Sequence, residues 1–553
     1  MSVSPPPSSP RGGSEPSAPT RSARLAWILR LVLDAAGWVV WFAALRALWR
    51  KMDLPVGFYD EGILLTDPQL MLAGKVPYRD FYSNYPPGTF MLLAALFKVF
   101  GPSVAVERWV GLVARATAGL WAGRLAGQVA GQRFSSVAAG LVTLWLTVIQ
   151  TEAYAYVLAV HGALLALVLV MHARDRGSRG AYVVAGVALG AVSWMRHDLF
   201  GLFAAAAAAG VLAVALKQRA WRPEVRPAWA WAPWLAAGLA LAIIPFWGTW
   251  FVLAGPKLVL DDLVFDQARY VLPARDLPMP PLLPLAEGRG LPFRLPVVMH
   301  LPFEGAVGLT LLGPALAALA VVFPGRTGAK GRLGAALVGA LSLGVIPQMV
   351  GRTDIFHAVY TVAPALVMIG VWELRLTEGA LWRWPLAVLI FGAALCPVRG
   401  YMLTPPYHPP PQPPGFERAS GREVAAAGSR LEVLKFIAEH TRSPQDPIYV
   451  GLLDHSFIFV NEMDLYFFAD RVGATRYMQF DPNVINRLDV QQRMAEEIKS
   501  SGTRVVILSG ITGRSFEPNE SVNQGSNYLD QYLREHFHVV RVVPPYVMML
   551  RKD

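Results

Sequence analysis

Two adjacent carboxylates, Asp60 and Glu61, follow the first long hydrophobic segment and open a short helical pattern that ends at Gly74. A carboxylate at the start of a helix is stabilised by the positive end of the helix dipole, so it stays ionised. An ionised carboxylate can accept a proton from an incoming hydroxyl group, which makes the pair a candidate for general-base catalysis. The competing interpretation is an ordinary helix start with two solvated acids.

The two acids belong to a longer run of aromatic, charged and glycine residues. It reads FYDEG over 58–62, AGKVPYRDFYSNYPPG over 73–88 and FKVFGPSVAVER over 97–108. Within the run, Arg79 and Asp80 form a second charged pair, whose competing interpretation is a solvated ion pair in a loop.

Two further clusters place cations and histidines at the ends of predicted membrane spans. They are Arg196-His197-Asp198 and a second group made of Arg352, Asp354 and His357. A guanidinium group binds phosphate oxygens through a bidentate fork, so either cluster is a candidate site for a phosphate group at the membrane boundary. The competing interpretation for both is anchoring to lipid headgroups.

Ionisable residues inside a span are costly unless they have a partner or a wet cavity. Arg115 lies near the middle of a predicted span. We expect it to make a structural ion pair, and a role along a substrate path is the second interpretation. Glu152, between two spans, is a weaker candidate for a second acid near the site.

The composition predicts an integral membrane protein. The chain has 553 residues, of which 54% are hydrophobic and only 16% are charged, too apolar for an ordinary soluble protein. Several stretches approach the ~20 residues that cross a hydrocarbon core of about 30 Å. We predict about eleven spans, over 25–49, 105–129, 134–150, 152–172, 181–196, 199–216, 229–254, 302–323, 332–349, 355–373 and 380–397.

Basic residues predict the orientation. The chain carries 50 basic and 39 acidic residues, a net charge of +11, and its basic clusters fall in loops on one side of the predicted bundle. By the positive-inside rule that side is the cytoplasm, which places the N-terminus inside and the loops 50–104 and 255–300 outside. A basic patch interleaved with exposed aromatic residues is absent from the sequence, so nucleic-acid binding is not predicted.

Outside the spans, two short apolar stretches at 62–73 and 89–101 are too short to cross the membrane. We expect both to lie along its outer surface, within the first external loop. Residues 1–24 are rich in Pro, Ser and Arg, and they predict a disordered cytoplasmic tail before the transmembrane part, 25–400.

A Pro-rich linker over 401–421 precedes a different kind of sequence over 422–553. Here β-type runs alternate with helical patterns, which favours a small α/β domain on the extracytoplasmic side. The predicted strands are 447–453, 504–510 and 538–549, and the predicted helices are 424–441, 488–501 and 526–537.

The segment from Phe58 to Arg108 resembles the first-loop signature of the GT-C glycosyltransferases. It is most similar to the branch that holds protein O-mannosyltransferases and bacterial transferases of aminoarabinose or hexoses from polyprenyl-phosphate carriers. The resemblance joins the Asp-Glu pair, a Gly-x-x-x-Tyr-Arg-Asp run, a Pro-Pro pair and a Phe-Gly before an Arg. The Arg-x-Asp-x-x-His pattern at 352–357 also resembles a pattern of bacterial members of the family. The remaining membrane helices resemble those of the family only in topology and composition.

The resemblance implies an inverting sugar transfer outside the cytoplasmic membrane, from a polyprenyl-phosphate donor to a hydroxyl of a glycan, lipid or protein. Asp60 matches the general base and Glu61 the neighbouring acid that helps to position the acceptor. Tyr59, Arg79 and Asp80 then belong to substrate binding, as do the two clusters described above. No cofactor and no metal ion are predicted, since the Asp-x-Asp pattern that holds a divalent ion between sugar phosphates is missing here.

The alternative function is a polytopic transporter or a flippase for a lipid carrier. Against it, the sequence has no internal repeat, and its candidate polar groups gather at one face, not at the midplane. Walker-type, HExxH and Gly-x-Ser-x-Gly motifs are also absent. A scaffold without catalytic activity remains a third interpretation, because fold does not imply activity.

Overall fold

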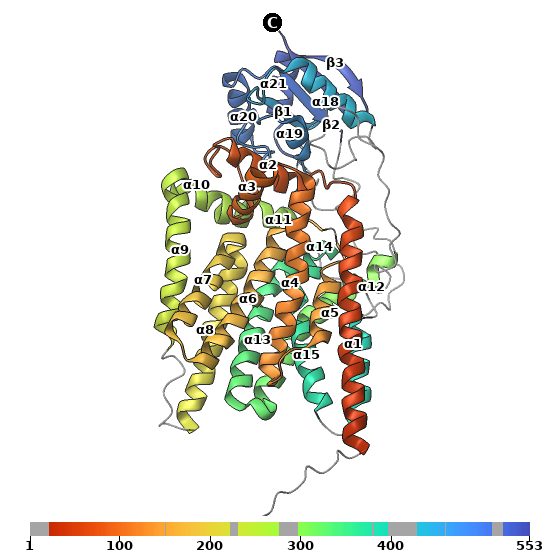
Figure 1. Ribbon diagram of the computed structural model, residues 1–553. Coiled ribbons are helices and arrows are strands. Elements are labelled where there is room, and N and C mark those ends of the chain that lie inside the picture. Colours follow the sequence, from red (N-terminus) through yellow and green to blue (C-terminus); the bar gives the residue numbers. More distant parts are fainter. Residues whose placement is uncertain are drawn as a thin grey trace, which may run out of the picture.

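The computed structural model describes residues 21–149, 151–221, 231–275, 297–378, 381–395, 428–458, 460–510 and 524–552. A tall helical bundle carries a small α/β domain on one end, which we call the domain end of the bundle (Figure 1). The predicted linker, 401–421, and most of the predicted tail lie outside the described residues. The first helix begins at Arg21, so the last residues of the predicted tail are helical.

The described bundle follows the predicted spans closely. The helices that correspond to these spans are α1 (Arg21–Arg50), α4 (Val104–Ala130), α5 (Ser136–Trp145), α6 (Ala155–Arg176), α7 (Arg179–Met195), α8 (His197–Trp221), α9 (Ala232–Ala254), α12 (Val297–Val322), α13 (Gly328–Val350), α15 (Ala363–Thr377) and α16 (Trp384–Leu395).

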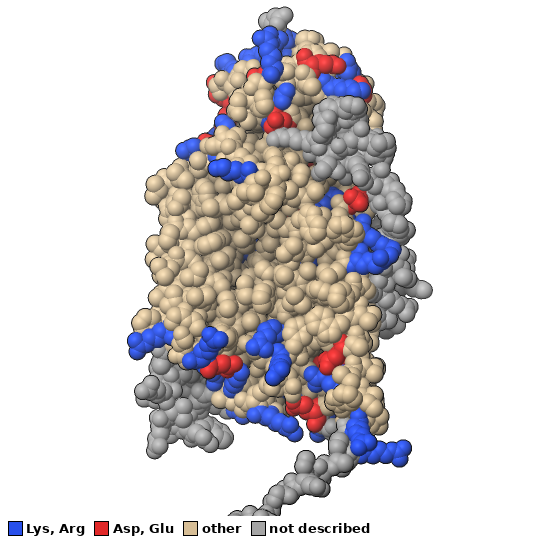
Figure 2. Space-filling model, viewed as in Figure 1, with Lys and Arg blue, Asp and Glu red and all other residues tan. Residues whose placement is uncertain are grey.

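The bundle has the surface of a multi-pass membrane protein. Among the described residues, six helices of at least 18 residues are apolar enough to cross a bilayer, and shorter apolar helices pack between them. Figure 2 shows a wide band almost without charged side chains, with lysines and arginines gathered at the end opposite the α/β domain. At that end Lys330 pairs with Asp175 at 2.7 Å, which joins two of the basic loops.

Two predicted spans are interrupted, and both interruptions have a local cause. Helix α5 stops at Trp145, because the carbonyl groups that follow are bound by cations: Lys51 Nζ donates to Thr147 O at 2.5 Å, and Arg115 Nε donates to Leu146 O at 2.9 Å. The predicted span 355–373 is divided into α14 (Ile355–Ala358), a 3-10 turn (Val359–Thr361) and α15, where Pro364 occupies the first turn.

Arg115 also donates to the carbonyls of Gly111, Thr151 and Glu152 at 3.1, 3.1 and 2.6 Å. This buried guanidinium therefore holds the segment that joins α5 to α6, a structural role as expected, although its described partners here are carbonyl groups and not the acid of an ion pair. The segment ends at Tyr154, directly before α6, and carries Glu152 to the domain end.

Two short helices cap the domain end, as the apolar stretches of the first loop predict. Helix α2 (Asp60–Leu72) begins at the Asp-Glu pair, and α3 (Gly88–Phe100) ends at Gly101, whose φ is +85°. Gly74, with a φ of +83°, follows α2 in the same way. In Figure 1 both helices lie between the bundle and the α/β domain.

The α/β domain has a four-stranded sheet of order β1-β2-β4-β3. Strands β1 (Ile448–Leu452) and β2 (Val505–Ser509) are parallel, and β4 (Tyr546–Arg551) pairs antiparallel with both β2 and β3 (Phe537–Val543). The predicted single strand 538–549 is wrong: Pro544 and Pro545 form a turn inside it, since proline has no N–H for the ladder, and the run becomes a hairpin. The helices are α18 (Gly428–His440), α19 (Asp464–Ala469), α20 (Leu488–Ser500) and α21 (Tyr528–His536).

Helix α2 is held against α19 of this domain. Thr66 Oγ1 donates to Met463 O at 2.8 Å, and the backbone N–H of Asp464 donates to Phe58 O at 3.2 Å. The glycine of the FYDEG run permits this approach, because a Cβ atom at Gly62 would lie 2.6 Å from the backbone nitrogen of Asp464.

We therefore expect Gly62→Ala to lower the free energy of unfolding of the detergent-purified protein by about 1–3 kcal/mol, the usual cost of overpacking. Thermal unfolding measures this. Gly201→Ala in α8 is the control, since a Cβ atom there meets no atom within 4 Å. Equal unfolding midpoints for the two variants would contradict the close packing of α2 on α19.

Candidate active site

Asp60 lies at the first turn of α2 and lines a small, partly open cavity at the domain end of the bundle. The cavity has a volume of about 10 Å³, room for one water molecule. Its other walls include Tyr85 from the loop before α3 and Tyr154 from the segment before α6. One carboxylate and two phenols from three separate segments thus converge on one point.

Tyr85 connects Asp60 with the first of the predicted cation clusters. Burial raises the pKa of Tyr85, and the charge of Asp60 raises it further, whereas the charge of Arg196 and a hydrogen bond with Tyr154 lower it. The phenol therefore stays neutral at neutral pH and lies within electrostatic reach of both an acid and a guanidinium. An acid and a guanidinium group of opposite charge thus both act on the Tyr85 hydroxyl.

Three tyrosine rings pack against one another near Tyr85 and Arg196. Tyr154 stacks on Tyr360 with ring centroids 5.6 Å apart, and Tyr156 lies 6.4 Å from Tyr360. The guanidinium carbon of Arg196 lies 5.2 Å from the centre of the Tyr156 ring, a cation–π geometry. Rigid aromatic groups from α6 and the broken span 355–377 thereby set the position of Arg196.

The first predicted cation cluster is tied to the end of α13, the helix that precedes the second cluster. Arg196 Nε and Nη2 donate to Asp198 at 2.9 and 2.6 Å, and Nη2 also donates to Gln348 Oε1 at 2.8 Å. Gln348 lies in the last turn of α13, four residues before Arg352, so this bond joins the α7–α8 turn to the end of α13. His197, beside Arg196, has its ring 6.5 Å from Trp247 in an edge-to-face contact.

In the second cluster a single carboxylate organises the other side chains. Arg352 Nε donates to Asp354 Oδ2 at 2.8 Å, and Asp354 Oδ1 accepts from the backbone N–H of His357 at 2.8 Å, which caps α14. The Nδ1 atom of His357 lies 2.8 Å from the same oxygen.

Glu61 points away from the cavity, and its surroundings differ from those of Asp60. Its side chain is 0% exposed, and Arg108 from α4 binds it in a bidentate pair with distances of 2.6 and 3.0 Å. Arg108 also donates to the carbonyls of Met52 and Leu54 at 2.8 and 2.6 Å. This pair anchors the start of α2, which also carries Asp60, to α4.

The remaining predicted residues of the first loop do not line this cavity. Tyr59 turns toward the α/β domain, where its hydroxyl donates to Phe480 O at 2.8 Å. Arg79 is half exposed and pairs with Asp80 at 2.8 Å, and Asp80 accepts from the Val76 N–H at 2.7 Å. These two form the loop ion pair that was the competing interpretation of their sequence.

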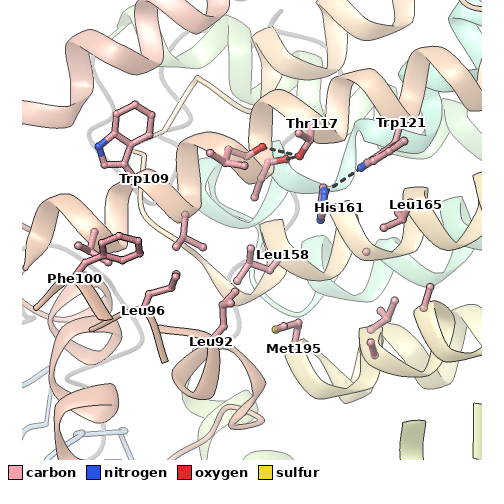
Figure 3. Close-up of a pocket in the computed structure, with 18 residues that line it drawn as sticks. Leu92, Leu96, Phe100, Trp109, Thr117, Trp121, Leu158, His161, Leu165 and Met195 are labelled. Atoms are coloured by element: carbon pink, nitrogen blue, oxygen red, sulfur yellow. Dashed lines mark hydrogen bonds between the residues drawn. The ribbon is translucent and has the colours of Figure 1, made fainter. Parts of the chain in front are cut away.

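An apolar groove of about 850 Å³ leads from the domain end into the bundle. Helices α3, α4, α6 and α7 form its walls (Figure 3), with Leu92 and Met195 at one end and Trp121 and Leu165 farther along. Trp121 Nε1 donates to His161 Nε2 at 3.1 Å, a bond that satisfies the polar atoms of this otherwise apolar wall.

The groove and the cavity are adjacent. In α3, Phe90 lines the cavity and Leu92 lines the groove. Met195 also lines the groove, and Arg196 follows it in the chain. Along α4 the lining runs from Val106 to Trp121, which corresponds to roughly 22 Å at the usual helical rise. Within the part of the chain that the structure describes, no group of three or more His, Cys, Asp and Glu side chains is placed to bind a metal ion.

Three residues that matter here received no role from the sequence. Tyr85 and Arg108 stand inside the run that carries the resemblance, so their presence was visible although their partners were not. No sequence pattern pointed to Tyr154. It lies near Asp60 because α5 ends at Trp145 and the non-helical segment that follows leads to the cavity.

The chain matches no protein-family model and no curated protein sequence. Its fold does match solved structures. ArnT from Cupriavidus metallidurans bound to undecaprenyl phosphate aligns with a TM-score of 0.51 at 15% identity, covering 95% of this chain and 98% of that chain. ArnT from the same organism in the apo state gives a TM-score of 0.48 at 16% identity, covering 96% and 98%. The first match shows a common fold over nearly the whole length and confirms the predicted GT-C-like bundle with its α/β domain.

Proposed function

We propose that this protein is an inverting membrane glycosyltransferase that moves a sugar from a polyprenyl monophosphate carrier to a hydroxyl group outside the cytoplasmic membrane. The observation that carries the proposal is the juxtaposition of Asp60 and Arg196 about Tyr85, at the end of a lipid-sized groove. The fold shared with the ArnT that binds undecaprenyl phosphate supports the choice of carrier.

In this reaction Asp60 is the general base. The acceptor hydroxyl gives its proton to the Asp60 carboxylate as its oxygen attacks the anomeric carbon of the donor sugar. The bond from that carbon to the phosphate oxygen breaks, and the phosphate leaves with the electron pair. Because attack and departure occur on opposite faces, the anomeric configuration inverts. The neutral hydroxyls of Tyr85 and Tyr154 line the same cavity as Asp60, and we propose that they contact the acceptor hydroxyl there, since the cavity has room for one such group.

Arg196 is the cation proposed for the leaving phosphate. Asp198 and Gln348 engage its Nε and Nη2 atoms, which leaves the Nη1 edge as the proposed contact for phosphate oxygen. Fixed positive charge near the departing oxygen stabilises the developing negative charge without reorganisation at the moment of reaction. Arg352 and His357, in the adjoining cluster, are proposed to bind the same headgroup.

The apolar groove is proposed to hold the polyprenyl chain of the carrier. A groove within the membrane band is filled by lipid chains, and this one ends at Met195, beside the proposed phosphate site. A chain lying along α4, α6 and α7 therefore brings its phosphate to Arg196.

Filling the groove tests this placement. We expect Ala191→Trp to raise the KM for a long-chain polyprenyl-phosphate donor at least several-fold, while the KM for a water-soluble short-chain donor changes little. The control is Val252→Trp, a lipid-exposed position on α9. Equal effects of Ala191→Trp on the two donors would contradict the proposed site of the chain.

The envelope glycans of a strain lacking the protein test the proposed function. We expect one sugar to be missing from an envelope glycan, lipid or protein, restored by the wild-type gene but not by the gene for Asp60→Asn. Restoration by both genes would overturn the role of Asp60. Accumulation of carrier-linked sugar on the cytoplasmic side alone would instead favour the alternative function, a flippase.

A further inference from the structure

The α/β domain reaches the candidate active site through the loop between α19 and α20. Asp481 in this loop has an exposed fraction of 0%. It lies against the two first-loop segments that carry Asp60 and Tyr85, residues that are distant in the chain but adjacent at the cavity.

The Asp481 carboxylate gathers donors from both segments. Tyr82 Oη donates to its Oδ2 atom at 2.9 Å, and Asn84 Nδ2 donates to the same oxygen at 3.1 Å. Tyr59 Oη lies 3.4 Å from Oδ1 while it donates to the neighbouring carbonyl of Phe480. Losing either hydrogen bond would leave a buried polar group unsatisfied, so the buried carboxyl group holds both segments in place.

These donors are direct neighbours of the residues proposed to act on the substrates. Tyr59 precedes Asp60, and Asn84 precedes Tyr85. A shift of either donor therefore moves the backbone of a residue at the cavity. The charge of Asp481 also raises the pKa of Tyr85, as expected for neighbouring groups.

A second set of contacts holds the same loop of the α/β domain in place. Arg476 Nε donates to Tyr78 O at 2.8 Å, and the Tyr82 N–H donates to Arg476 O at 2.8 Å. Arg476 also pairs with Asp262, after α9, at 2.5 Å. The loop is thus tied to the first loop and to the segment after α9, which holds Asp481 against the first loop.

We propose that Asp481 is a positioning residue for the sugar transfer, which makes the α/β domain part of the active-site geometry. By fixing Tyr59 and Asn84, its carboxylate sets the separation of Asp60 and Tyr85. The inference rests on the proposed function. Displacing a catalytic group by about 1 Å can cost on the order of 100-fold in rate, so the effect falls on the chemical step.

The test is Asp481→Asn in the full-length protein, assayed in proteoliposomes with a polyprenyl-phosphate sugar. The amide accepts hydrogen bonds through one oxygen only, and more weakly than a carboxylate, so the bonds from Tyr82 and Asn84 weaken and the contact near Tyr59 is lost. We expect kcat to fall about 10–100-fold, with the KM for the donor within about twofold of wild type. Asp489→Asn, the same change at an exposed position eight residues away, should leave both constants unchanged.

Tyr82→Phe separates misplacement from loss of fold, because it removes one hydroxyl and adds no new group. We expect a thermal midpoint near that of wild type, a several-fold lower kcat, and a double variant with Asp481→Asn that is less impaired than the product of the single effects.

Wild-type kcat in a folded Asp481→Asn protein would overturn the inference, and so would a raised donor KM with unchanged kcat. Failure of the proposed function looks different. In that case the wild-type protein itself transfers no sugar, whereas failure of this inference leaves wild type active, Asp60→Asn inactive and Asp481→Asn fully active.

Discussion

Asp60→Asn is expected to lower the kcat for sugar transfer by about 10²–10⁴-fold, the usual contribution of a general base. Asparagine keeps the volume of the side chain but cannot accept the proton of the acceptor hydroxyl. Binding of the carrier should survive, because the proposed contacts of the phosphate and the chain lie at Arg196 and in the groove. Steady-state kinetics together with a direct binding measurement for the lipid donor separate the two effects.

The matched control is Asp53→Asn, an exposed acid in the same loop before α2, which should transfer sugar at the wild-type rate. A folded Asp60→Asn protein with wild-type kcat would remove Asp60 from the chemistry. Loss of donor binding alone, with kcat unchanged, would give Asp60 a binding role instead.

Arg108→Met is expected to destabilise the protein by about 3–5 kcal/mol, because it leaves the buried carboxylate of Glu61 without its ion-pair partner. Thermal unfolding in detergent measures the loss. The double variant Glu61→Gln/Arg108→Met should recover part of it, since the unpaired charge is removed with its partner. Recovery will be incomplete because Arg108 also binds the carbonyls of Met52 and Leu54.

Arg79→Met is the control for this pair. Arg79 and Asp80 form the same kind of ion pair at an exposed position, where water screens the charges, so the unfolding midpoint should hardly move. If Arg108→Met and Arg79→Met were equally stable, the burial of the Glu61–Arg108 pair would not contribute as described.

Local signals in the sequence predicted the elements that carry the site. The acids at the start of α2 and the glycine after it predicted nearly the whole helix: the predicted range is 62–73, and the observed helix is Asp60–Leu72. The lengths of the apolar stretches similarly predicted the spans, and the ends of these spans located the turns that hold Arg196 and Arg352. These features depend on neighbours in the chain, which a single sequence displays.

Contacts between distant residues were beyond such reasoning. Glu61 and Asp60 are indistinguishable in sequence, and only Arg108, 47 positions away, turns one of them into an anchor. The end of α5 at Trp145 depends on the buried cations Lys51 and Arg115, and periodicity does not reveal them. Asp481 carried no signal, because its three partners lie about 400 positions earlier in the chain.

The stoichiometry of the reaction tests the central claim most directly. Purified wild-type protein in proteoliposomes, given a polyprenyl-phosphate sugar and an extract of envelope acceptors, should release one polyprenyl monophosphate for each sugar attached, with inverted anomeric configuration. Movement of intact carrier-linked sugar across the bilayer without release of polyprenyl monophosphate would contradict the account.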